Sequence, residues 1–273
     1  MQTIDTQLQL VKGRLSQACA NAGRSVDEVT LLAVSKLQPA AAVRQAHAAG
    51  LRAFGENYVQ EGLDKVAQLA DLRPSIEWHL IGPLQSNKTR PVAEQFDWVH
   101  SVDRLKIAQR LAEQRPAGLA PLNICLQVNV SAEPSKHGVL PAELPALALA
   151  VARLAAEQPQ RLRLRGLMSI PEPAQGDEAQ RRPHRALKAL WAQLKAQGLD
   201  LDTLSMGMSA DLEAAVAEGS TLVRVGTALF GERPIKPETA AAVATDRPCG
   251  WPPDARGSPA VSSGTSPGNA GHN

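Results

Sequence analysis

The sequence alternates short apolar runs with segments of helical periodicity, and this alternation is its most constraining feature. We count eight apolar runs, at residues 29–35, 51–56, 76–82, 97–102, 122–130, 162–170, 202–208 and 221–226. Helical segments separate them; residues 187–194, for example, place Leu or Trp at positions i, i+3, i+4 and i+7. Strands that alternate with helices predict a parallel sheet covered by helices.

The number of repeats favours a closed barrel over an open sheet. Eight strand–helix repeats in about 200 residues match a (β/α)8 barrel in number and length. A doubly wound sheet is the alternative, but it usually has fewer strands, and the first strand–helix turn here lacks G-x-G-x-x-G. Apolar side chains at helical spacing predict one extra helix before the first strand: Ile4, Leu8, Val11, Leu15 and Cys19. We therefore predict a (β/α)8 TIM barrel over residues 1–236.

The last part of the chain differs in composition. Residues 237–273 are rich in Ala, Gly, Pro and Ser and show no apolar period, so we predict a disordered tail. A net charge of +2 is too balanced to predict a nucleic-acid or anionic-membrane partner. The three cysteines are far apart, which fits neither a disulfide framework nor a metal cluster. With no signal-peptide pattern and no long apolar stretch, we expect a cytoplasmic protein.

Polar and small residues gather where the predicted strands end, which is where a barrel of this type carries its site. Gly207 and Ser209 in MGMS, and Gly226 and Thr227 in VGTALFG, each precede a short helical stretch. Unpaired backbone N–H groups at such turns attract anions, glycine permits close approach, and a hydroxyl adds a donor. Because the loops after the last two strands of a barrel often bind phosphate, the two turns together predict a phosphate site.

Lys36 ends the first apolar run, beside the eighth strand of a closed barrel. An amine near a phosphate site predicts a phosphorylated ligand that carries an aldehyde or ketone. Attack requires a neutral amine, and lowering a lysine pKa from about 10.4 to about 7.5 costs about 4 kcal/mol. Burial and a cationic neighbour such as Arg224 are the expected sources of that shift. A solvent-facing Lys36 and a Schiff-base aldolase acting on sugar phosphates remain alternatives on the residues alone.

Several stretches carry a resemblance to a known family: VSK, FGENYVQE, WHLIGPLQSNK, GLMSIP and MGMSADLEAAVAEGSTLVRVGTALFG. Over residues 5–234 the chain resembles the pyridoxal phosphate homeostasis protein family, single barrels similar to the alanine racemase N-terminal domain. The resemblance implies a Schiff base between Lys36 and pyridoxal 5'-phosphate (PLP), with Asn57 beside the cofactor and Arg224 at its pyridine nitrogen. It further implies phosphate binding by Ser209, Gly226 and Thr227, and a ring lined by Val34, His79, Met168 and Met208.

The resemblance implies a PLP carrier rather than an enzyme. Arginine does not readily release its proton, so Arg224 would leave the pyridine nitrogen unprotonated and the ring a poor electron sink. Such a protein would store PLP, deliver it to PLP-dependent apoenzymes, and affect amino-acid and keto-acid balance indirectly. The alternative is a weak amino-acid racemase. The related racemases add a β domain with a tyrosine base, whereas the single tyrosine here is Tyr58, so we expect a monomeric carrier.

Two positions depart from, or add to, the family pattern. The family often continues VSK with Thr and Lys, whereas this chain has Leu37 and Gln38. A basic side chain beside the site is therefore replaced. Lys136, in SKHG, is interpreted either as a second amine near the pocket mouth or as a solvated loop charge.

Overall fold

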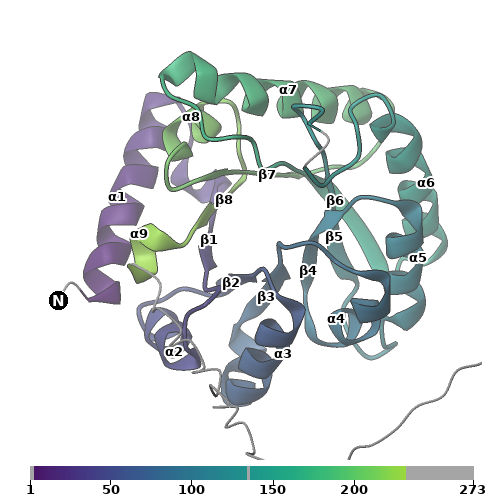
Figure 1. Cartoon of the computed structure of the whole chain (residues 1–273), viewed down its shortest axis with the longest axis horizontal. Helices are drawn as coiled ribbons and strands as arrows, with labels where there is room; N and C mark the ends of the chain where they lie inside the picture. The colour runs from purple at the N-terminus through teal and green to yellow at the C-terminus, as the bar shows by residue number, and fades with distance from the viewer. Residues whose placement is uncertain (1–2, 134–135, 232–273) are drawn as a thin grey trace, which may run out of the picture. The chain divides into compact units, whose positions relative to one another are not determined.

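Eight parallel strands form a closed barrel in the computed structural model, which describes residues 3–133 and 136–231. The strands are β1 (Thr30–Val34), β2 (Ala53–Glu56), β3 (Glu77–Leu80), β4 (Trp98–Val102), β5 (Leu122–Gln127), β6 (Leu162–Met168), β7 (Thr203–Met208) and β8 (Leu222–Val225). Each strand pairs with the next one in sequence, and β8 pairs with β1 to close the ring (Figure 1). The predicted (β/α)8 barrel is confirmed, and the open-sheet alternative is wrong.

Helices surround the barrel. They are α1 (Ile4–Asn21), α2 (Ala40–Ala48), α3 (Val59–Gln68), α4 (Thr89–Gln95), α5 (Leu105–Gln114), α6 (Leu144–Glu157), α7 (Asp177–Ala196), α8 (Leu212–Ala217) and α9 (Thr227–Phe230). Three short 3-10 turns complete the described part: η1 (Val26–Glu28), η2 (Ala70–Ser75) and η3 (Ser86–Lys88). The extra helix predicted at the N-terminus is α1, which begins where the Thr3 hydroxyl accepts a hydrogen bond from Thr6 N–H. It packs against α8 and α9 (Figure 1).

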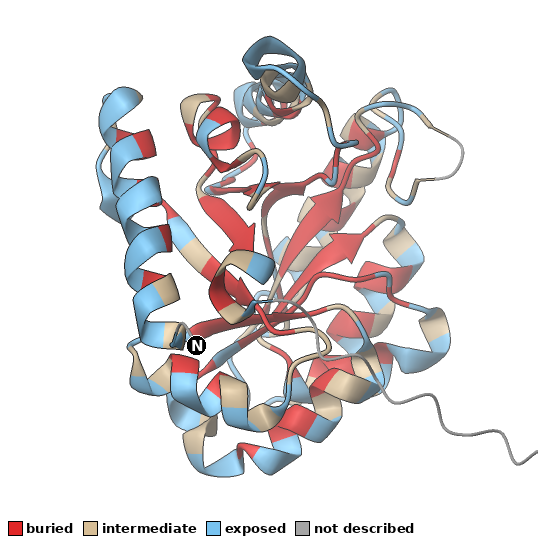
Figure 2. Cartoon of the chain, turned by 60° about the vertical axis from the view of Figure 1, so that its left-hand side comes forward, coloured by how far each residue is buried: buried red, intermediate tan, exposed pale blue. Residues whose placement is uncertain are grey.

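Side-chain alternation along the strands divides the core into two parts. Residues such as Ala33 and Phe54 face outward and join the large apolar layer between the strands and the helices. Their neighbours face inward and form two smaller apolar clusters, one around Leu32 and Val34 and the other around Trp98. Figure 2 shows the result: the strands are buried, whereas the helices are buried on one side and exposed on the other.

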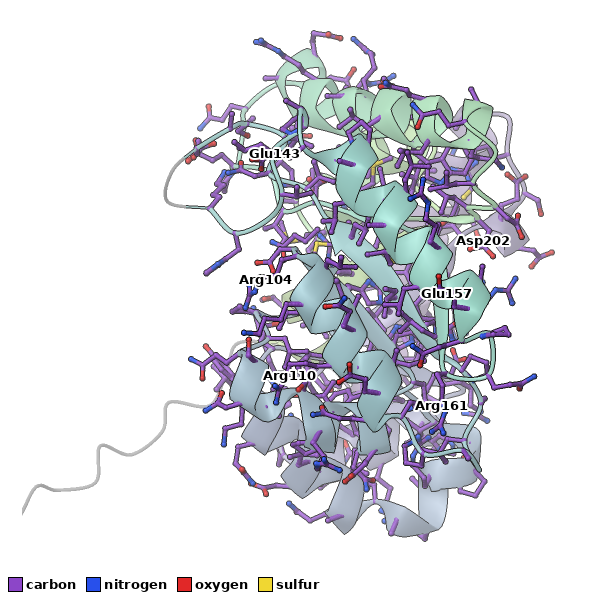
Figure 3. All side chains as sticks on the ribbon, turned by 90° about the vertical axis from the view of Figure 1, so that its right-hand side faces the viewer. Arg104, Arg110, Glu143, Glu157, Arg161 and Asp202 are labelled. Carbon is purple, nitrogen blue, oxygen red and sulfur yellow. The ribbon has the colours of Figure 1, made fainter. Side chains whose placement is uncertain are left out.

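The two rims of the barrel are distinguished in Figure 3, which views the molecule from the side of α5 and α6. Arg104 and Glu143 lie at the rim where the strands end, and Glu157, Arg161 and Asp202 lie at the rim where they begin. None of the helices in the described ranges is long and apolar enough to span a bilayer. The predicted tail, residues 237–273, lies outside the described residues, and the cytoplasmic location remains a prediction.

The short helical stretch predicted after MGMS is α8, which begins only at Leu212. The Asp211 carboxylate accepts a hydrogen bond from Met208 N–H at 2.7 Å. That bond holds residues 209–211 in a turn, because a side chain that binds nearby backbone competes with helix formation.

Candidate functional site

A cavity of about 420 Å³ opens at the rim where the strands end. Eight of its lining residues were predicted from the sequence: Val34, Lys36, Asn57, Met208, Ser209, Arg224, Gly226 and Thr227. Six were not: Gln38, Ile81, Ile170, Ala210, Phe230 and Gly231. Lys36 therefore shares one cavity with both predicted phosphate turns. Ile81 and Ile170 could have been found from the sequence, because each lies within a predicted strand, in phase with its inward-facing positions.

Two predicted ring-lining residues, His79 and Met168, are not part of the cavity wall. Each lies two residues before an isoleucine that does line the cavity, so its side chain faces the same way but one layer deeper in the barrel. The Met168 side chain packs with Trp98 and Cys125. The His79 ring stacks on Trp98 with centroids 5.3 Å apart. Their contact with a bound ring stays a prediction, because strand alternation places both side chains on the inner face, one layer below the cavity wall.

The backbone around Lys36 is held by a buried cluster of charges. Lys65 Nζ donates a hydrogen bond to the carbonyl of Ser35 at 2.6 Å, immediately before Lys36. On the other side, the N–H of Leu37 donates to Glu61 Oε1 at 2.5 Å, and Lys65 also pairs with Glu61 at 2.8 Å. Leu37 has a φ of 62°, a left-handed conformation that side-chain-bearing residues rarely adopt. Lys36 thus leaves β1 on a turn fixed from both sides.

Glu56 completes this cluster. Its Oε1 accepts from Ser35 Oγ at 2.6 Å and from Lys65 Nζ at 2.8 Å. Burial raises the pKa of Glu56, and Lys65 and Ser35 partly oppose that rise. The cluster is a buried ion pair whose partners also bind the backbone, so its geometry is coupled to that of Lys36.

Gly207, near the end of β7, allows α8 to pack closely against the strand. Gly207 has a φ of 93°, and a Cβ there would lie 2.4 Å from that of Ala215. Asp211 fixes the turn after β7 through Met208 N–H and through His184 Nε2, which donates to Asp211 Oδ2 at 2.9 Å. Burial alone would raise the pKa of Asp211, but the hydrogen bonds from His184 and Met208 outweigh burial and lower it.

Donors at the two turns point to an anion. The hydroxyls of Ser209 and Thr227 and the backbone N–H groups of Ser209 and Gly226 make no hydrogen bond to the described part of the chain. A Cβ at Gly226 would lie 3.1 Å from the carbonyl oxygen of Val34, so glycine permits β8 to end close against β1. These donors and Lys36 line the same cavity, and together they can bind a phosphate group.

Arg224 forms the inner wall of the cavity. Nη1 donates to the Ser205 carbonyl at 2.6 Å and to Ser205 Oγ at 2.8 Å, and Nη2 donates to the Ser169 carbonyl at 2.8 Å. Burial lowers the pKa of Arg224 to about 10, so the side chain keeps its charge at neutral pH. The guanidinium is therefore a fixed hydrogen-bond donor. Across residues 3–133 and 136–231, no cluster of three or more His, Cys, Asp or Glu side chains could hold a metal ion.

Comparison with known proteins agrees with this geometry. Residues 12–234 match the family model of the alanine racemase N-terminal domain. The pyridoxal phosphate homeostasis protein of Pseudomonas aeruginosa is 63% identical over 233 residues, which cover 85% of this chain and 97% of that protein.

Solved structures give the same result. PipY of Synechococcus elongatus without PLP is 42% identical, with a TM-score of 0.73, and the match covers 84% of this chain and 100% of PipY. PipY with PLP bound is 43% identical, with a TM-score of 0.68 and coverage of 80% and 100%. On these matches, the chain belongs to the pyridoxal phosphate homeostasis protein family, built on the alanine racemase N-terminal domain.

Proposed function

We propose that this protein holds pyridoxal 5'-phosphate reversibly as a Schiff base on Lys36 and contributes to PLP homeostasis by storing and delivering it. The observation that carries the proposal is one cavity that combines Lys36, two phosphate-binding turns and a buried arginine. A relative, PipY, has been solved with PLP bound. The donor set fits the three functional ends of PLP: its aldehyde, its phosphate and its pyridine nitrogen.

The phosphate end fits the turns after β7 and β8. Ser209, Gly226 and Thr227 supply hydroxyl and N–H donors that have no acceptor within the described residues. Asn57 lines the same cavity, and its Oδ1 is buried without a hydrogen-bond partner there. A buried amide oxygen without a partner is costly, so Asn57 is proposed to bind a donor group on the ligand.

Arg224 is proposed to face the pyridine nitrogen. A bound PLP ring supplies an electron sink, and that sink is strongest when its nitrogen carries a proton. Arg224 stays charged at neutral pH and acts only as a donor. It would therefore hold the ring nitrogen unprotonated, an environment that favours retention of the cofactor over carbanion chemistry.

The lining of the cavity favours a carrier over a racemase. Racemisation needs a base on each face of the substrate. Among the described lining residues, Lys36 is the one lysine, and no His, Tyr, Cys, Asp or Glu accompanies it. Tyr58 adjoins Asn57 in sequence but is 56% exposed and does not line the cavity. His79 is buried in the barrel interior, away from the cavity wall.

The absorption spectrum tests this proposal. A Schiff base conjugated with the PLP ring absorbs near ~420 nm, so wild type incubated with PLP should show this band and Lys36→Ala should lose it. Lys106→Ala, which alters an exposed lysine on α5, is the matched control and should keep the band. A band that survives in Lys36→Ala would contradict the proposal.

Two further assays separate carrier from enzyme. PLP-loaded protein mixed with a PLP-free aminotransferase should restore activity in that enzyme as the bound PLP transfers. Single enantiomers of several amino acids should remain unchanged on incubation with loaded protein. Robust Lys36-dependent racemisation would favour the weak-racemase alternative instead.

A further inference from the structure

A line of buried polar side chains crosses the barrel interior beneath the cavity. Arg224 on β8 donates to Ser205 Oγ on β7, as described above. His100 Nδ1 on β4 lies 2.8 Å from the same oxygen, and His100 Nε2 lies 2.9 Å from His79 Nδ1 on β3. All four side chains are buried. Four strands on opposite sides of the barrel are thus joined by one hydrogen-bonded chain.

The Arg224 guanidinium, at one end of this chain, sets the direction in which the hydrogen bonds are donated. Arginine only donates, so Ser205 Oγ accepts from Arg224 and its own proton must go to the remaining neighbour, His100 Nδ1. His100 then carries its proton on Nε2 and donates to His79 Nδ1. His79 in turn carries its proton on Nε2, which makes no hydrogen bond within the described residues but faces Glu77 Oε2 at 3.8 Å, at the start of β3.

The reverse direction leaves two defects. Ser205 Oγ would accept from both neighbours, and its buried hydroxyl proton would have no acceptor, which is costly. The lone pair of His79 Nε2 would also face the Glu77 carboxylate. Burial lowers the pKa of both histidines, most strongly that of His100, so both rings stay neutral. Each neutral ring can then accept a hydrogen bond on one nitrogen and donate one from the other, as the chain requires.

We propose that Arg224, Ser205, His100 and His79 form a directional hydrogen-bond chain locked in one tautomer, in which Ser205 and His100 are positioning residues for Arg224. The chain fixes the plane of the guanidinium and keeps Ser205 Oγ as an acceptor beneath it. The positioning role rests on the proposed function, because the orientation of Arg224 affects PLP binding only if PLP occupies the cavity. The tautomers themselves do not depend on it.

The first test uses cofactor-free wild type labelled with ¹⁵N-histidine. Two-bond ¹H–¹⁵N spectra at pH 7 should show both His79 and His100 neutral with the proton on Nε2. Spectra of His79→Gln and His100→Asn would assign the two rings among the six histidines. A proton on Nδ1 of either ring, or an imidazolium at pH 7, would overturn the chain. The tautomers are read from wild type, and the two variants serve only to assign the signals.

The second test measures PLP affinity. Ser205→Ala and His100→Phe remove the link to Arg224, and each should weaken PLP binding about tenfold. His100→Asn keeps an acceptor for the Ser205 hydroxyl and should stay within about twofold of wild type. Ser220→Ala is the matched control: Ser220 is also buried, but its hydroxyl donates to the Met206 carbonyl at 2.7 Å, outside the chain.

The outcomes separate the two proposals. Equal affinity in all variants would contradict the positioning role. Equal losses in Ser205→Ala and Ser220→Ala would also contradict it, because they would indicate general destabilisation. If wild type itself binds no PLP, the proposed function fails, and the tautomer spectra still decide whether the chain exists.

Discussion

Lys65 is the buried cation on which the turn at Lys36 depends. It contacts Glu56, Glu61 and the carbonyl of Ser35, and it is 4% exposed. A buried ion pair gives little net stability because desolvation offsets the attraction, but removing one partner strands the other charge. The role of Lys65 is therefore conformational: it fixes the residues on both sides of Lys36.

Lys65→Met should destabilise the protein by about 3–5 kcal/mol at pH 8, because Glu56 is left as a buried charge. The loss should be smaller at pH 5. The folded-state pKa of Glu56 is already raised by burial, and losing Lys65 raises it further. A carboxyl group with a raised folded pKa favours folding when protonated, and this contribution disappears as the pH rises through that pKa. Urea unfolding at both pH values measures the difference.

A second substitution identifies the cause. Adding Glu56→Gln to Lys65→Met removes the stranded charge, so the double variant should recover part of the stability at pH 8 and lose the pH dependence. Lys12→Met changes an exposed lysine within α1 and should have little effect at either pH. A loss in Lys65→Met that is equal at pH 5 and pH 8 would rule out the buried charge as its origin.

At the scale of elements, α1 connects the N-terminal part of the chain to the turn after β7, which is proposed to bind phosphate. Arg14 on α1 donates to the carbonyl of Ser209 at 3.1 Å and forms a two-point ion pair with Glu213 on α8. The helix that precedes the barrel thus braces the turn after β7 from outside. This contact joins positions 195 residues apart in the chain.

Arg14→Met should affect PLP retention more than stability. Both partners of the ion pair are partly exposed, so its loss should change the free energy of unfolding by less than about 1 kcal/mol. The Ser209 turn loses one hydrogen bond, and PLP should dissociate about threefold faster. Arg44→Met removes a similar surface pair with Asp71, between α2 and η2, and is the control. Equal dissociation rates in the two variants would contradict a bracing role for α1.

Features that follow from local sequence pattern could be predicted from the sequence, whereas features that arise from contacts between distant elements could not. Strand periodicity and the strand-end positions predicted the barrel and five lining residues, Lys36, Ser209, Arg224, Gly226 and Thr227, because local pattern fixes which side of a strand a residue faces. The family resemblance added Val34, Asn57 and Met208. Local pattern did not give the depth of His79 and Met168, since alternation does not say which layer of the barrel a side chain fills. Nor did it reveal Arg14 or Lys65, whose roles arise from contacts between separate elements.

At the scale of the whole molecule, apolar exposure argues for a monomer. The large apolar side chains exposed among the described residues are scattered over separate elements: Leu10, Val26, Tyr58, Leu119, Leu140, Leu149 and Ile170. Single exposed apolar residues are normal, whereas stable subunit interfaces usually have an apolar centre. We therefore expect a monomer.

Sedimentation velocity tests the oligomeric state. The protein should sediment as a single species of 29.0 kDa, with or without PLP. The ligand does not change the expectation, because the cavity is lined by residues of one chain and binding needs no second copy. A concentration-dependent shift toward twice that mass would contradict the monomer. If PLP alone induced the shift, a second copy would have to contact the rim at which the cavity opens, and substituting Tyr58 or Ile170, which are exposed near that rim, should then restore the monomer.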